Sequence, residues 1–260
     1  MLPAMHIARA AALVLLLALA APARAGRPET VHDRVSQVLA AYGGWGRLAP
    51  VRAYRVEGDF FSAMRHSTVP TTRVFARPDR FKTLIDYPDH LEARLVDGAR
   101  GWRTEPGGGL AEVQGPMRMA MVLQAARCDV PWILAERESL ARFIEPLERE
   151  GVLLQGLEIP LGDGLVFRAW TDPVTHLVRV SQGALVDGRM ATHFETYYSD
   201  FRDVNGLKFA FREENFASGT QTGITLVKRV VLNPPLAPAE FTPPSLPDSL
   251  PRAGADRSHG

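Results

Sequence analysis

Residues 54–60 read YRVEGDF, and apolar and charged side chains alternate through this stretch. Tyr54, Val56 and Phe60 fall on one face of an extended chain, and the three charged residues fall on the other face. This two-residue period is typical of a β-strand with one buried and one solvated face. The stretch therefore predicts an antiparallel sheet that packs one face against a core.

The same period recurs along most of the chain, and turn signals such as Asp97-Gly98 and Asn205-Gly206 separate the alternating segments. The first predicted strand begins at Val51. Further strands are predicted at residues 73–77, 80–87, 90–96, 101–104, 152–159, 165–171, 176–182, 190–198, 207–216 and 223–232. Because a sheet with so many strands rarely stays flat, we expect one strongly curved antiparallel sheet.

Two segments have helical rather than strand periodicity. Residues 31–42 carry a single apolar stripe, which is formed by Val31, Val35, Val38, Leu39 and Tyr42. Residues 116–150 predict two or three short helices that end near Gly151. Helices packed on the apolar, concave side of a curved sheet give a mainly β fold of the α+β class.

The N-terminus has the three parts of a cleavable export signal. A leader with one positive charge precedes the apolar run 10–21, and Ala23 and Ala25 fit the A-x-A cleavage rule. We therefore predict a signal peptide at 1–25, a folded domain at 26–243, and a disordered Pro-rich and polar tail at 244–260. The alternative is an uncleaved anchor, but the run of 12 residues is short for a bilayer that needs about 20. After cleavage the protein should not span a membrane, and it should work outside the cytoplasm.

Charge and cysteine content exclude some classes of partner. Arg9 and Arg24 leave with the signal, so the formal net charge falls from +1 to −1. A nearly neutral chain argues against binding to nucleic acid through bulk charge. Cys128 is the single cysteine and cannot form an internal disulfide. Its predicted neighbours are apolar, which favours a buried and unreactive thiol.

Motifs for catalysis or metal binding are absent from the sequence, which contains neither H-E-x-x-H nor G-x-S-x-G. The segment 200–206 has some features of a calcium loop but no closing glutamate, and Asn205-Gly206 explains it better as a hairpin. Glu213 and Glu214 are consecutive on a strand, so they point to opposite faces and cannot act as a pair. We predict a protein that is not an enzyme and that holds no cofactor or metal ion.

Large apolar side chains are spread over many of the predicted strands. One interpretation is an ordinary core beneath the helices. The other is a cavity that a few short helices cannot fill, in which each buried CH₂ of an acyl chain would contribute about 0.8 kcal/mol. The residues that we expect to line such a cavity are Tyr54, Val56, Phe60, Phe75, Phe81, Ile85, Leu91, Leu95, Trp102, Met119, Phe167, Phe194, Phe209 and Phe211.

Several further segments, which span roughly residues 40–243, form a set. They are Tyr42-Gly43-Gly44-Trp45, Arg80-Phe81, Val96-Asp97-Gly98 with Gly101-Trp102, residues 170–177, residues 198–209, and residues 230–236 followed by Phe241. Taken together, they resemble the LolA-like superfamily of periplasmic lipoprotein carriers. The resemblance implies a half-open β-barrel with a helical lid that carries or senses acylated molecules. None of the carrier's ligand-handling residues can be matched one by one, so none is transferred.

The sequence therefore predicts a non-enzymatic periplasmic carrier that binds a lipid or the acyl chains of a lipoprotein, in keeping with a role in lipoprotein sorting and outer-membrane biogenesis. An inner- or outer-membrane protein is a second candidate partner. Two alternatives stay open. One is a regulatory scaffold that senses envelope stress with the same fold, and the other is a periplasmic hydrolase.

Overall fold

The alternating stretch 54–60 lies in strand β1 (Ala53–Ser62), which is next to the central strand of the sheet. β1 pairs with β2 (Ser67–Ala76) on one side and with β13 (Thr220–Leu232) on the other. The computed structural model describes residues 28–105, 108–187 and 190–243. The strands in these residues form one 13-stranded sheet in which every pair is antiparallel.

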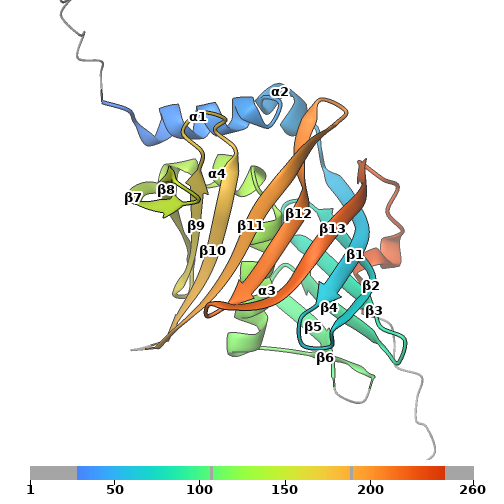
Figure 1. The fold of residues 1–260 in the computed structure, drawn as a ribbon. Helices are drawn as coiled ribbons and strands as arrows, with labels where there is room; N and C mark the ends of the chain where they lie inside the picture. Colours follow the sequence, from blue (N-terminus) through green and yellow to red (C-terminus); the bar gives the residue numbers. More distant parts are fainter. Residues whose placement is uncertain (1–27, 106–107, 188–189, 244–260) are drawn as a thin grey trace, which may run out of the picture.

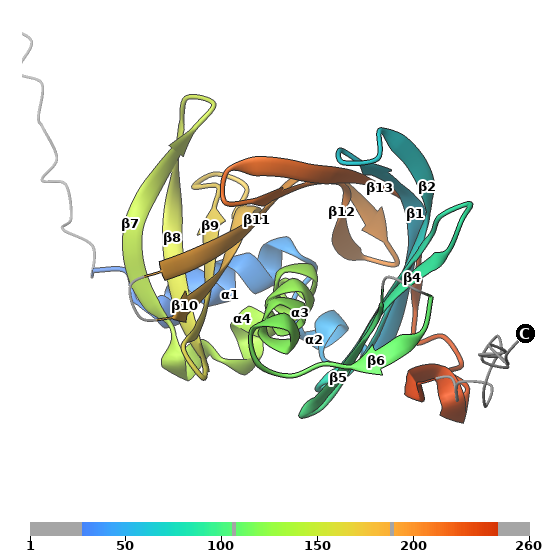
Figure 2. The ribbon, with the colours of Figure 1, turned by 90° about the horizontal axis from the view of Figure 1, so that it is seen from below.

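The strand order shows that the sheet is two meanders joined in the middle. From β1 the order runs outward through β2 to β3 (Arg80–Asp86), β4 (Leu91–Asp97), β5 (Arg100–Thr104) and the edge strand β6 (Leu110–Glu112). From β13 it runs outward through β12 (Leu207–Ala217), β11 (Met190–Val204), β10 (Val178–Asp187), β9 (Leu165–Thr171), β8 (Val152–Gly162) and the edge strand β7 (Arg142–Arg149). The two edge strands do not pair with each other, so the sheet curves into a half-open barrel (Figures 1 and 2).

The helices close the hollow side of this sheet. Helices α3 (Gly115–Cys128) and α4 (Trp132–Glu136) and the short 3₁₀ helix η1 (Glu138–Leu140) connect β6 to β7, and Figure 2 shows the sheet bent around α3. Helices α1 (Val31–Ala41) and α2 (Trp45–Leu48) lie across one end of the barrel (Figure 1). The 3₁₀ helix η2 (Pro238–Phe241) lies on the outer face, beside β3 and β4.

Helix α1 begins where its sequence provides a capping box. Thr30 accepts a hydrogen bond from the Asp33 backbone N–H, and the Asp33 carboxylate accepts one from the Thr30 backbone N–H. These contacts satisfy two backbone donors that the helix itself cannot pair. The helix then packs Val35 and Val38 into the core, with neither side chain exposed. The apolar stripe predicted at 31–42 is therefore confirmed.

Two glycines allow the lid helix α3 to approach the sheet closely. A Cβ at Gly183 in β10 would lie 2.9 Å from the Cβ of Leu123 in α3, which is too close for any real pair of carbon atoms. A Cβ at Gly101 in β5 would lie 3.2 Å from the Arg118 side chain of the same helix. α3 is thus held against β10 by the absence of a side chain there.

The main core lies at the end of the barrel that α1 covers. Tyr54 stacks between Phe75, at a centroid distance of 4.5 Å, and Trp132 of α4, at 5.1 Å. The Trp132 indole N–H donates to the Leu48 carbonyl oxygen at 3.0 Å, which ties α4 to α2. This end of the barrel is filled by the protein's own aromatic side chains.

The predicted fold is confirmed, and the differences are local. Residues 142–149 were expected to be helical, but they form the edge strand β7. The register of β7 shifts between Ile144 and Leu147, and this irregularity separates apolar residues by three positions, as a helix would. In addition, β2 begins at Ser67 rather than at residue 73, β10 begins at Val178 rather than at 176, β11 continues to Val204, and β6 was not predicted.

The expected signal peptide 1–25 and the tail 244–260 lie outside the described residues. Within the residues that are described, no helix combines the length and apolarity needed to cross a bilayer.

Candidate functional site

A cavity of about 430 Å³ lies between α3 and the concave face of the sheet, and we call it the inner cavity. Strands β1 to β5 and β11 to β13 form its wall, and α3 forms its lid. Its large apolar lining residues are Phe60, Met64, Ile85, Tyr87, Met117, Met121, Phe194 and Phe216. The lid residue Met117 is 47 % exposed and Met64 is 86 % exposed, so both mark where the cavity meets solvent.

A row of polar side chains crosses the wall of the inner cavity. The strand register places Arg73 opposite Thr83, Thr83 opposite Arg94, and Arg94 opposite Arg103, on the adjacent strands β2 to β5. All four residues line the cavity. Counting Arg127 of α3, four arginines face it against two glutamates. The inner cavity is therefore amphipathic, with excess positive charge.

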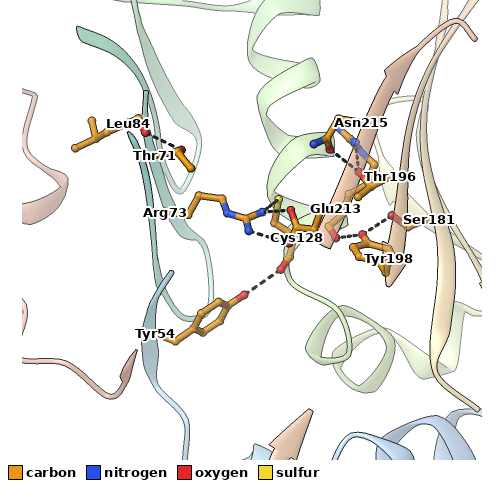
Figure 3. Close-up of polar contacts among 11 residues, drawn as sticks. Tyr54, Thr71, Arg73, Leu84, Cys128, Ser181, Thr196, Tyr198, Glu213 and Asn215 are labelled. Carbon is orange, nitrogen blue, oxygen red and sulfur yellow. Dashed lines mark hydrogen bonds and ion pairs between the residues drawn. The ribbon is translucent and has the colours of Figure 1, made fainter. Parts of the chain in front are cut away.

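Arg73 of this polar row forms a buried ion pair with Glu213 of β12. Two guanidinium nitrogens of Arg73 donate to the two carboxylate oxygens of Glu213, at 2.7 and 2.8 Å, as Figure 3 shows. The desolvated charges compensate each other, and the nearby carboxylate counters the effect of burial and holds the pKa of Arg73 well above its ordinary value. Glu92 is likewise paired with Arg94, at 2.5 Å. Both cavity-lining carboxylates are thus engaged by arginine.

Cys128, the last residue of α3, lies at the inner end of the cavity. Its sulfur accepts a hydrogen bond from Arg73 at 3.0 Å, so its neighbours are charged rather than only apolar as expected (Figure 3). Burial nevertheless raises the pKa of the Cys128 thiol, although Arg73 and Arg127 oppose the shift. A thiol that resists deprotonation is a poor nucleophile.

Hydrogen bonds and ion pairs connect the corner between α3 and α4 to the sheet. Asp129 accepts hydrogen bonds from the Tyr54 hydroxyl at 2.9 Å and from Arg77, whose one nitrogen reaches both carboxylate oxygens, at 2.7 and 2.8 Å. Arg77 also pairs with Glu136 of α4. Burial raises the pKa of Asp129 to about 6, although Arg77 works in the opposite direction.

A second hollow, the outer cavity, has a volume of about 550 Å³ and lies on another side of the lid. It is lined by residues of β3, α3, α4 and the loop between β8 and β9. A surface hollow of about 710 Å³ adjoins the inner cavity, with which it shares Glu92, Arg103 and Met117. A void of only about 30 Å³ lies at the deep end, between Tyr54 and Cys128.

The structure distributes the fourteen predicted residues over different places. Phe60, Ile85 and Phe194 line the inner cavity, Phe75 and Phe81 line the outer cavity, and the small void is bounded by Tyr54, Val56, Phe75 and Phe209. The remaining residues line none of these hollows. Phe167 and Phe211 are buried in the main core, Leu95 and Trp102 pack on the outer face with Phe241, Leu91 is 48 % exposed, and Met119 is half-buried.

The charged residues of the inner cavity were missed by the sequence analysis. A signal for Arg73 exists, since it is two residues from Phe75 and therefore on the same face of β2. The same parity places Glu213 with Phe211 on β12. In β4 the apolar residues do not mark the cavity face. Glu92 and Arg94 face the cavity, while Leu95 faces outward.

Nothing in this arrangement is suited to metal chemistry within the described residues, where no group of three or more His, Cys, Asp or Glu could hold an ion. The hairpin expected at 200–206 is present, with Asn205 at a φ of 54° and the Gly206 N–H bonded to Asp203. What the site offers is a partly apolar enclosure with fixed positive charge at its inner end.

Comparison with known proteins identifies the fold and not the activity. No family model matches the sequence, and no curated protein matches it. Among solved structures, the chain is similar to a protein described as an outer membrane lipoprotein-sorting protein domain from Vibrio parahaemolyticus. That protein has a TM-score of 0.51 and 11 % identity, over 82 % of this chain and 97 % of the other.

Two further structures agree with this likeness. A LolA superfamily protein from Nitrosomonas europaea has a TM-score of 0.53 and 12 % identity, over 82 % of this chain and 98 % of the other. A DUF1329 family protein from Desulfovibrio piger ATCC 29098 has a TM-score of 0.53 and 10 % identity, over 81 % of this chain and 96 % of the other. The chain therefore has a LolA-like fold, as the sequence resemblance predicted.

Proposed function

We propose that this protein is a non-enzymatic periplasmic carrier that binds the acyl chain of a lipid or lipoprotein in the inner cavity. The observation that carries the proposal is the inner cavity itself, with about 430 Å³ of space between α3 and the sheet. Ligand pockets of proteins typically measure about 300–1,000 Å³ and are mostly apolar with a few polar groups. Each methylene buried there would contribute about 0.8 kcal/mol, so a chain binds without any special motif.

The composition of the wall supports a flexible ligand rather than a rigid one. Met64, Met117 and Met121 contribute unbranched, adaptable side chains to the same cavity as the rings of Phe60 and Phe216. The adjoining surface hollow provides a path from solvent to Met117. A chain could therefore enter along the lid without unfolding the sheet.

A carrier role also agrees with the state of the polar groups. The two cavity glutamates are bonded to arginines, and burial raises the pKa of the Cys128 thiol. None of these groups is poised as a general base or nucleophile. The proposed export signal at 1–25 and the likeness to a lipoprotein-sorting protein domain support a periplasmic location, where a membrane protein would deliver or accept the ligand.

The test is native mass spectrometry with lipid extraction on protein purified from the periplasm of a bacterial host. We expect co-purifying acyl mass, or uptake of added lipid or lipopeptide. The double variant Met64→Asp/Met117→Asp places charges at the cavity mouth on side chains that are already exposed, and it should lose this mass. The matched control is Leu153→Asp/Val174→Asp, whose positions are 60 % and 83 % exposed and line none of the hollows.

Retention of the acyl mass by the control and its loss from the cavity variant would support the carrier function. A wild-type protein that is empty and also ignores added lipid and lipopeptide would overturn it, and would favour a scaffold that uses the fold as a binding surface.

A further inference from the structure

Arg127 is a buried cation for which the described residues provide no carboxylate partner. It is the second-last residue of α3, is 7 % exposed, and lines the inner cavity. No carboxylate of the described residues lies within ion-pairing distance of it. Burial lowers the pKa of Arg127, and the charge of Glu213, which acts in the opposite direction, does not offset this effect. A buried charge is costly unless something of opposite charge compensates it.

The hydrogen bonds of Arg127 leave one edge of its guanidinium free. Nη1 donates to the Thr196 hydroxyl at 2.6 Å, and Thr196 in turn donates to Asn215 at 3.0 Å. Figure 3 shows the contact between Thr196 and Asn215 on the neighbouring strands β11 and β12. The Nε atom is buried and has no partner. The guanidinium is therefore positioned by one nitrogen and by the Phe194 ring, whose centroid is 5.7 Å from Cζ, while Nε and Nη2 make no hydrogen bond to the described residues.

Elsewhere in this chain the same edge of arginine binds carboxylates. Arg100 donates from Nε and Nη2 to the two oxygens of Glu112, at 3.0 and 2.8 Å. Arg34 does the same with Glu29. This edge matches the spacing of two oxygens in a carboxylate or phosphate. At Arg127 no group of the described residues fills that role, and Glu213, which lines the same cavity, already gives both oxygens to Arg73.

We propose that Arg127 binds the carboxylate or phosphate headgroup of an acyl lipid that enters the inner cavity head first. This inference rests on the proposed carrier function and names its ligand class. The headgroup lies at the polar row, where Arg103, which has no carboxylate partner among the described residues, adds positive charge. The acyl chain then follows α3 outward from Arg127 to Met117, ten residues away, which is about 15 Å along the helix. The protein therefore prefers a free anionic amphiphile to a chain whose polar end is attached to a protein.

The test compares ligands that share one chain and differ in the head. Decanoate, decyl phosphate and decanol are titrated against the full mature protein by displacement of the neutral dye Nile red. A charge-assisted pair inside a protein strengthens binding by about tenfold or more. Wild-type protein should therefore bind the two anions at least about tenfold more tightly than the alcohol. Arg127→Gln should abolish this preference by weakening the anions, with decanol unchanged.

The matched control is Arg118→Gln. Arg118 lies on the same helix and also has a buried Nε without a partner, but it lines the outer cavity. The control should keep the preference for anions. A second readout separates binding from structure: because Arg127 is a buried charge without a carboxylate partner, Arg127→Gln should leave the thermal midpoint equal or higher. A lower midpoint with an unchanged preference would make Arg127 a structural residue and overturn the proposal.

Acetate and inorganic phosphate distinguish the source of the anion. If they bind in an Arg127-dependent manner while chain length has no effect, the subsite is for a free anion and the head-first lipid is refuted. If wild type binds decanoate and decanol equally, the anion subsite is refuted and the carrier function stands. If none of the three amphiphiles displaces the dye or binds by calorimetry, the carrier function fails as well.

Discussion

Replacement of Ala120 by phenylalanine should block the inner cavity from the side of its lid. Ala120 is a half-buried residue of α3, and its side chain lines the cavity. The added phenyl ring would occupy part of a space of about 430 Å³ that the protein leaves unfilled. Because the ring enters existing space, the free energy of unfolding should hold or rise slightly, as is usual for cavity-filling substitutions.

The effect on binding follows from the methylenes that the ring displaces. A ring of about six carbons should exclude about three methylene groups of an acyl chain, each of which contributes about 0.8 kcal/mol when buried. The loss is then about 2.4 kcal/mol, and since 1.4 kcal/mol corresponds to tenfold, binding should weaken about 50-fold. Titration with decanoate under Nile red displacement measures this directly.

Met119→Phe is the control, because it introduces the same ring on the same helix, one residue away, at a half-buried position that lines none of the hollows. Its affinity should stay within about twofold of wild type. If Ala120→Phe folds and binds decanoate as tightly as wild type does, the inner cavity is not where the chain lies. The outer cavity would then be the better candidate.

Three further substitutions test the interior. Arg73→Leu should lower the free energy of unfolding in urea by about 3–5 kcal/mol, because Glu213 stays buried without its partner. The double variant Arg73→Leu/Glu213→Leu should recover most of this loss, and an equal loss in the single and double variants would contradict the pairing. Gly183→Val should cost about 1–3 kcal/mol, because α3 must move off β10, and an unchanged urea midpoint would contradict that seating. Asp129→Asn should flatten the dependence of stability on pH. Burial raises the Asp129 pKa from 3.8 to about 6, so its contribution is present below about pH 4 and lost as pH rises through about 6, by about 3 kcal/mol in all. An unchanged curve would contradict this.

The strands could be predicted because each one that faces a core alternates with a period of two. Residues 54–60 fall in β1 with Tyr54 and Val56 buried on its concave face, as the pattern indicates. The failure at 142–149 also has a physical reason. β7 is an edge strand with a register shift, so its apolar residues are not spaced by two, and three-residue spacing favours a helix.

The candidate site could be predicted only in part, because alternation gives two faces but does not say which one is concave. Leu95 and Trp102 look like cavity residues in the sequence, yet they face outward, where Phe241 of η2 covers them. The apolar covering of the outer face comes from a segment more than 130 residues away in the chain. No local pattern could have revealed that contact, so Leu91 and Leu95 were expected on the cavity side of β4, which Glu92 and Arg94 occupy instead.

The cavity and its charge have a common origin in the way that the lid is seated. Gly183 lets α3 approach β10 and Gly101 lets it approach β5, and the inner cavity lies along the strands between these two contacts, where Arg73, Thr83 and Arg94 of the polar row lie. An aliphatic wall could collapse onto the helix and close that space. Arg94 and Arg103 oppose such a collapse, because both are only half-buried and it would desolvate their guanidinium groups. The same arginines that keep the interior open also define the charge of the molecule that fits there.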